Sequence, residues 1–166
     1  MEEQKLHKVE WTLAIDTREQ TPWLFEGITK RIDKENVPVV IPTDVVTLKT
    51  GDYSIVGFED RICIERKSAK DLIQTVAHSR DRFERELRRM QAMEFSAVIV
   101  EEEWREVLTI CAATTGYNPI SLDNSILAWQ QRFRGTHWLW RPTRNTAAKT
   151  AYKVLDRFYR DRERQQ

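Results

Sequence analysis

The sequence predicts an α/β fold in which helices cover a central mixed sheet. Two observations support this prediction: strand patterns dominate the chain up to residue 67, and strand and helix patterns alternate after it. With 166 residues, 40% of them hydrophobic, the chain can form one domain with a substantial core. We expect this domain to span residues 11–160, between a polar segment 1–10 and a basic tail 161–166.

Strands are expected throughout the N-terminal half. The alternating stretch 11–16 is typical of a strand, and residues 17–27 are predicted to form a loop after it. Pro38 and Pro42 favour an edge strand or an irregular segment over residues 36–44. Residues 45–67 are then predicted to run strand, turn, strand, turn, strand.

Helices and strands alternate in the second half. Ser68 and Asp71 resemble a capping box that starts a helix over 69–77. A second helix is expected over 81–93, a buried strand over 94–100, a helix over 102–113 and a short strand over 137–140. Helical spacing of apolar residues predicts three stripes: Phe83, Leu87 and Met90; Leu122, Ile126, Trp129 and Phe133; and Ala148, Ala151, Tyr152, Leu155 and Phe158.

The charges are segregated along the chain, although their sum is only +1. Acids gather in 59–66 and 100–104, whereas 79–90 and 141–166 are rich in arginine and lysine. An acidic metal site beside phosphate-binding surfaces would give this pattern, and so would solvated helix faces that carry ion pairs.

Location and redox state follow from what the sequence lacks. No apolar run approaches the ~20 residues of a spanning helix, and residues 1–10 do not resemble a signal peptide. These features predict a cytoplasmic, nucleoid-associated protein. Cys63 and Cys111 lack the spacing of a zinc site and are predicted to be reduced core thiols.

A predicted hairpin brings acids from two strands together. If strands on either side of the loop 57–60 pair, Asp52 lies opposite Glu65 and Tyr53 lies opposite Ile64. A slip of one residue would turn Glu65 to the apolar face. In the predicted register, alternation gives an apolar face with Tyr53, Ile55, Ile62 and Ile64, and a second face with Asp52, Ser54, Cys63, Glu65 and Lys67.

Opposed carboxylates need a positive partner, because their Cβ atoms lie only about 5 Å apart. Mg²⁺ prefers carboxylate oxygens and water, so Asp52 and Glu65 are candidate metal ligands. Lys67 on the same face can orient or help to deprotonate a metal-activated water, or stabilise charge at phosphorus. The alternative is structural: Asp52 is a turn residue, Glu65 and Lys67 form an ion pair, and Asp71 caps a helix.

The stretch GDYSIVGFEDRICIERKSAKD (51–71) resembles the GD…ERKxxxD motif of the XPF (ERCC4-type) family of structure-specific endonucleases. AIDTREQ (14–20) is similar to the D-x-R-E element of this family, and SAVIVEE (96–102) to its later buried strand. The resemblance covers about residues 11–160 and implies the restriction-endonuclease-like, PD-(D/E)xK fold. It also implies an endonuclease, dependent on Mg²⁺ or Mn²⁺, that cuts branched, flapped or junction DNA in repair or recombination.

Two other functions stay open. One is a DNA-binding or scaffolding subunit that has lost catalysis, although such subunits usually lose one of Asp52, Glu65 and Lys67, which are all present here. The other is a sequence-specific enzyme of the restriction type on the same fold, which the ERK motif at residues 65–67 disfavours.

The resemblance also assigns site residues. It implies that Asp52, Glu65 and Lys67 are catalytic, that Asp16 joins Asp52 and Glu65 as a direct or water-mediated metal ligand, and that Arg66 holds the site together or contacts phosphate. Glu19 and Asp71 would be further acidic site residues. DNA phosphates would contact arginines of the following helix, unless these only form a solvated face: Arg80, Arg82, Arg85 and Arg89. The family usually has glycine before the first of these, where this chain has Ser79.

The last expectations concern partners. Gly135 is the last glycine, so we do not expect the tandem helix-hairpin-helix module typical of the family. Branch selectivity would then be weaker, or would come from a DNA-targeting partner protein or from dimerisation. The resemblance implies a homodimer, and Trp129 and Phe133 are predicted at its interface because residues 126–140 hold more aromatic surface than a small core readily hides. An ordinary core is the alternative.

Overall fold

The computed structural model describes residues 5–164 and contains a central sheet of six strands. In this sheet β7, β8 and β9 run parallel, whereas β6 is antiparallel to β2 and β7, so the predicted mixed sheet is confirmed. The strands lie in the order β5 (Thr43–Val46), β2 (Leu13–Asp16), β6 (Tyr53–Ile55), β7 (Ile62–Lys67), β8 (Phe95–Val100) and β9 (Thr136–Trp140).

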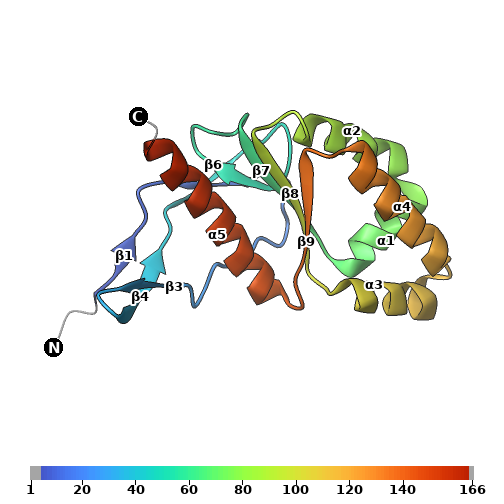
Figure 1. The fold of residues 1–166 in the computed structure, drawn as a ribbon, viewed down its shortest axis with the longest axis horizontal. Helices are drawn as coiled ribbons and strands as arrows, with labels where there is room; N and C mark the ends of the chain where they lie inside the picture. Colours follow the sequence, from blue (N-terminus) through green and yellow to red (C-terminus); the bar gives the residue numbers. More distant parts are fainter. Residues whose placement is uncertain (1–4, 165–166) are drawn as a thin grey trace.

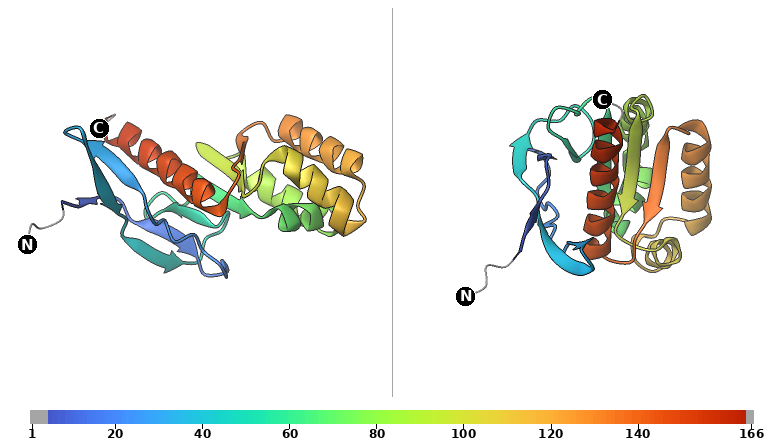
Figure 2. Two further views of the ribbon diagram at one scale, coloured as in Figure 1. Left: turned by 90° about the horizontal axis from the view of Figure 1, so that it is seen from below. Right: turned by 60° about the vertical axis from the view of Figure 1, so that its left-hand side comes forward.

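Helices cover both faces of this sheet (Figures 1 and 2). Two helices connect β7 to β8, namely α1 (Ala69–His78) and α2 (Arg80–Met90). The connection from β8 to β9 contains α3 (Trp104–Ile110), the π-helix η1 (Cys111–Thr115) and α4 (Pro119–Arg132). The long C-terminal helix α5 (Arg144–Glu163) lies on the opposite face from α4 (Figure 2).

Strand alternation divides the core into two halves. Ile62 and Ile64 of β7 pack with α5, whereas Cys63 packs with the α1–α4 helices. β8 repeats the pattern, since its residues 97 and 99 face α5 and its residues 98 and 100 face the other helices. The predicted apolar face of the hairpin is therefore confirmed, and the acids of the hairpin share a face with Cys63.

A small second sheet was not predicted. It has the order β1 (His7–Lys8), β4 (Glu35–Val40), β3 (Thr29–Ile32), and it lies at the end of the molecule away from α1–α4 (Figure 1). Asp33 and Lys34 both have positive φ, as a tight two-residue hairpin turn requires. β4 is the middle strand of this sheet, not the edge strand or irregular segment predicted around Pro38, which pairs with Thr29 of β3.

Helix positions agree with the predictions, but some ends differ. The Ser68 side chain accepts a hydrogen bond from the Asp71 N–H, so the predicted start of α1 is confirmed. The helix expected over 81–93 ends at Met90, and the one expected over 102–113 changes to a π-helix after Ile110. Cys63 and Cys111 are buried and not joined by a disulfide. Among the helices within residues 5–164, none has the length and apolar character needed to cross a bilayer.

Trp129 and Phe133 do not lie on an exposed patch, so this part of the predicted dimer interface is wrong. Their exposed fractions are 0% and 2%, and both belong to the core between the sheet and α1–α4. The Trp129 ring packs 5.2 Å from that of Phe83, and its N–H donates to Glu84. The helices on this face enclose more aromatic volume than the chain length led us to expect, and the alternative of an ordinary core is correct.

Candidate active site

The turn before β6 places Asp52 beside Glu65. Tyr53 pairs with Ile64, and the Asp52 N–H donates to the Ile64 carbonyl at 2.8 Å, which confirms the predicted register. Gly51 has a φ of 76°, and a Cβ atom there would lie 2.9 Å from that of Cys63. The turn therefore packs tightly against β7 and requires glycine.

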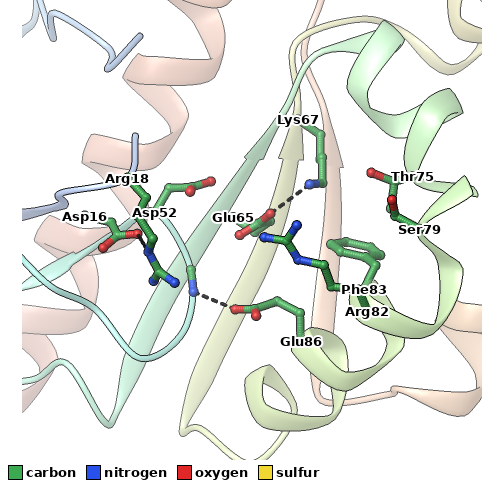
Figure 3. Close-up of a pocket in the computed structure, with 11 residues that line it drawn as sticks. Asp16, Arg18, Asp52, Glu65, Lys67, Thr75, Ser79, Arg82, Phe83 and Glu86 are labelled. Carbon is green, nitrogen blue, oxygen red and sulfur yellow. Dashed lines mark hydrogen bonds and ion pairs between the residues drawn. The ribbon is translucent and has the colours of Figure 1, made fainter. Parts of the chain in front are cut away.

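A cavity of about 300 Å³ opens on this face of the hairpin (Figure 3). It contains five of the predicted site residues: Asp16, Asp52, Glu65, Lys67 and Arg82. The other lining residues come from the segments around β2 and β6 and from α1 and α2, and they are Arg18, Gly51, Thr75, Ser79, Phe83 and Glu86.

Asp52 and Glu65 resist ionisation where they lie. Burial and the nearby charge of Glu65 raise the pKa of Asp52 to about 8, although the Arg66 N–H donates to its carboxylate at 2.7 Å. Burial likewise raises the pKa of Glu65, and the charge of Glu86 adds to this effect. The protein alone therefore does not stabilise both groups in their ionised forms.

Lys67 is protonated at neutral pH. Burial would lower the pKa of its ammonium, but the charge of Glu65 and the hydrogen bond from Lys67 Nζ to Glu65 Oε1 (2.9 Å) raise it overall. The same Nζ lies 4.8 Å from the centre of the Phe83 ring, a cation–π contact. These contacts fix the ammonium at the cavity wall, where it can stabilise negative charge. A protonated lysine cannot act as a general base, so the geometry favours this role over deprotonation of water.

Asp16 is committed to contacts within the protein. Its carboxylate accepts hydrogen bonds from Arg18 Nε at 2.7 Å and from the Leu48 N–H at 3.1 Å. Arg18 also donates to the Leu48 carbonyl, so the two residues hold the segment that follows β5. The Arg18 side chain is 65% exposed and lies at the rim of the cavity. Asp16 thus lines the cavity with both oxygens already hydrogen-bonded.

Arg66 points away from the cavity and joins four parts of the chain. It forms ion pairs with Glu19 at 2.9 Å and with Glu101 at 3.0 Å, and Glu101 also pairs with Arg144 of α5. The indole Nε1–H of Trp23 donates to the same Glu101 carboxylate at 2.6 Å. The Arg66 side chain is 10% exposed, so the network supports β7 from behind, and Glu19 belongs to it rather than to the cavity.

Several other predicted site residues lie outside the cavity. Asp71 is exposed on the first turn of α1. Arg80 lies over the Trp129 ring and donates to Ser125, so it helps to join α2 to α4. Arg85 and Arg89 are exposed on α2, and Arg89 pairs with Glu86 and donates to Thr50.

Sequence reasoning missed Arg18, Phe83 and Glu86 as cavity residues. Arg18 lies within AIDTREQ, two residues after Asp16, and that motif was a usable signal. Phe83 was assigned to the core stripe of its helix, where it also packs. No local pattern marked Glu86, because its place depends on how α2 packs against the hairpin.

The donor set suits a hard divalent cation. Burial raises the pKa values of both Asp52 and Glu65, and a cation between the two carboxylates would stabilise their ionised forms. Within residues 5–164, no group of three or more His, Cys, Asp or Glu side chains is already arranged to hold a metal ion. Mg²⁺ commonly binds through one or two carboxylates and keeps several waters, so Asp52 and Glu65 suffice as protein ligands.

The ERCC4 domain matches residues 15–154, which include the whole 51–71 motif and all the helices that line the cavity. The chain belongs to the ERCC4 domain family. Two solved structures are similar to this ERCC4 domain. The first is XPF from Aeropyrum pernix, with a TM-score of 0.62 and 19% identity over 89% of this chain and 64% of that chain. The second is XPF from Aeropyrum pernix in complex with DNA, with a TM-score of 0.59 and 18% identity over 91% of this chain and 66% of that one.

At these identities the likeness establishes the fold of the ERCC4 domain, which is restriction-endonuclease-like as the motif implied. The chain spans slightly less than two thirds of the length of those solved chains, 64% and 66%. No curated protein matches its sequence.

Proposed function

We propose that this ERCC4 domain is a metal-dependent DNA endonuclease. The observation that supports this best is the meeting of Asp52 and Glu65 beside the protonated Lys67 in one cavity. Carboxylates that lie opposite each other repel and destabilise a fold. In a metal-dependent phosphodiesterase, Asp52 and Glu65 would instead bind the cation that the reaction needs. Membership of the family and a solved relative described in complex with DNA support the same class of substrate.

Asp52 and Glu65 are the proposed ligands of Mg²⁺ or Mn²⁺, which when bound would polarise the phosphodiester and supply an activated water. Lys67 would stabilise the charge that develops on the phosphoryl oxygens, since Glu65 and Phe83 hold its ammonium in place. Asp16 would keep Arg18 and the segment after β5 in position rather than ligate the metal directly.

DNA would approach over α2 and the rim of the cavity. Arg82 extends from α2 into the cavity and Arg18 lies on the opposite side (Figure 3), so the two can contact phosphates on either side of the scissile bond. Arg85 and Arg89 are exposed on the same helix and would contact more distant phosphates. Arg80 packs against Trp129 and is not proposed to contact DNA.

The proposed substrates are branched, flapped or junction DNA, encountered in repair or recombination in the cytoplasm. A second copy of the chain, or a DNA-targeting protein, would supply branch selectivity. A dimer interface cannot include the buried Trp129 and Phe133. Light scattering at micromolar concentration is expected to give twice the mass of one chain, and a monomer would reject the homodimer.

Cleavage of end-labelled DNA tests this function. Single strands, duplexes, flaps, forks and four-way junctions are incubated with Mg²⁺, Mn²⁺ or EDTA and either wild type or Asp52→Asn. We expect metal-dependent cutting that falls by at least about 10³-fold in the variant, as for loss of a main electrostatic group. Asp60→Asn makes the same charge change at an exposed position in the same hairpin and should cut normally. Metal-independent cutting, undiminished cutting by Asp52→Asn, or binding without cutting would each reject the proposal.

A further inference from the structure

Helix α2 carries one carboxylate to the cavity that the motif does not contain. Phe83, Leu87 and Met90 bury one face of this helix. Glu86 follows Phe83 by three residues and therefore lies on the adjoining edge of the same face. Its side chain is 20% exposed and extends across the cavity toward the hairpin (Figure 3).

Glu86 is attached to the turn that precedes Asp52. Its Oε1 accepts a hydrogen bond from the Gly51 N–H at 2.9 Å, and its Oε2 pairs with the exposed Arg89 on the outer side. The turn itself packs tightly against Cys63 of β7. The backbone of Gly51, which precedes Asp52, thus holds Glu86 at the edge of the cavity.

The charges that line the cavity are unequally paired. Arg18 pairs with Asp16, and Lys67 pairs with Glu65. The ion pair of Glu86 is with Arg89, which lies outside the cavity lining, and Asp52 has no ion pair among the described residues. Arg82, the third cation of the lining, has no ion pair among the described residues, so four lining carboxylates face three lining cations and one negative charge is in excess. A divalent cation near Asp52 and Glu65 would be attracted by this charge as well.

From this arrangement we infer that the carboxylate charge of Glu86, acting without a direct bond to the metal, increases the affinity of the site for an oxygen-binding divalent cation such as Mg²⁺ or Mn²⁺. The inference rests on the proposed function, because it concerns the same cation. It assigns α2 a share in metal binding, in addition to the strands that carry Asp52 and Glu65.

The test measures binding of Mn²⁺ alone to the full chain, by calorimetry or by the electron paramagnetic resonance signal of free Mn²⁺. Glu86→Gln removes the charge but keeps an oxygen that can accept from the Gly51 N–H, so the turn is preserved. We expect its Kd for Mn²⁺ to rise about 3–10-fold, the scale of one unit charge acting at short range in a solvated site. Asp81→Asn makes the same charge change at an exposed position of α2 and should leave the Kd within about 1.5-fold of wild type.

The possible outcomes distinguish failure of this inference from failure of the proposed nuclease function. Weaker Mn²⁺ binding by Glu86→Gln, with an unchanged melting temperature, supports the inference. If Glu65→Gln weakens binding but Glu86→Gln binds as wild type does, Glu86 only fixes the turn; the inference is then overturned and the nuclease proposal stands. If wild type neither binds Mn²⁺ nor cleaves DNA, the proposed function fails and the inference fails with it.

Discussion

Consecutive residues of β7 enter two charge clusters of opposite character. The acidic cluster (Asp52, Glu65 and Lys67) lies at the cavity, whereas the Arg66 cluster (Glu19, Arg66, Glu101 and Arg144) lies on the other face of the strand. In the Arg66 cluster every carboxylate has a cationic partner. In the acidic cluster the Lys67 ammonium pairs with the buried Glu65, and the half-buried Asp52 has no ion pair among the described residues.

The pKa values of the carboxyl groups are shifted in opposite directions in the two clusters. Burial would raise the pKa of Glu19, but its contacts with Arg66 outweigh burial and lower it. Burial and the charge of Glu65 raise the pKa of Asp52 to about 8. The Arg66 cluster therefore stabilises the fold when charged, and the acidic cluster destabilises it. A destabilising charge cluster in a cavity indicates function, because nothing in the fold requires it.

Among substitutions that leave both proposed metal ligands in place, that of Lys67 should have the largest effect on DNA cleavage. Lys67→Met removes the ammonium proposed to stabilise charge on the phosphoryl group, and we expect DNA cleavage to fall about 10²–10³-fold. Mn²⁺ binding should persist, because Asp52 and Glu65 are unchanged. Lys70→Met, at an exposed position of α1, is the matched control and should cleave normally. Cleavage within about threefold of wild type in Lys67→Met would remove Lys67 from the catalytic set.

Substitution of Arg66 should instead affect stability most. Arg66→Met leaves Glu19 and Glu101 without their shared partner, at side-chain exposures of 7% and 9%. Breaking a buried pair in this way costs about 3–5 kcal/mol, which lowers the Tm by roughly 6–20 °C for a chain of this length. Thermal unfolding compares this variant with Arg85→Met, which is exposed on α2 and should melt as wild type does. A Tm within about 2 °C of wild type would show that the clusters do not differ as described.

The two clusters should also respond to pH in opposite directions. The raised pKa of Asp52 gives a contribution to stability that is complete below its unfolded value near 4 and is lost as pH rises through about 8. The lowered pKa of Glu19 gives a contribution that is present above its unfolded value and is lost in acid. Thermal unfolding of metal-free protein should therefore show a decline in Tm of about 2–8 °C between pH 6 and 9. Asp52→Asn should abolish this decline, and an equal decline in the variant would assign it to other groups.

The acidic cluster was predictable because its geometry is local. Alternation and the turn at Gly57 were enough to set Tyr53 opposite Ile64, and this register placed Asp52 beside Glu65 and turned Arg66 away from Lys67. The motif at residues 51–71 then suggested the chemistry.

Features that depend on packing between distant segments were not predictable in this way. Glu86 reaches the cavity only because α2 packs against the hairpin, which no local pattern encodes. Trp129 was assigned to the surface because the sequence alone does not show how many aromatic side chains the core between the sheet and α1–α4 can enclose. The hairpin of β3 and β4 was missed because Pro38 argued against a paired strand, whereas its place in the ladder depends on the partner strand.

The central claim is that the acidic cluster destabilises the metal-free fold and binds a cation. The most direct test compares thermal unfolding of wild type and Asp52→Asn at pH 9, in EDTA and in Mg²⁺. In EDTA the variant should melt about 2–8 °C above wild type, since carboxylate repulsion is relieved. Mg²⁺ should raise the Tm of wild type toward that of the variant and leave the variant little changed. A variant that melts below wild type in EDTA, or that Mg²⁺ stabilises as much as wild type, would contradict the account.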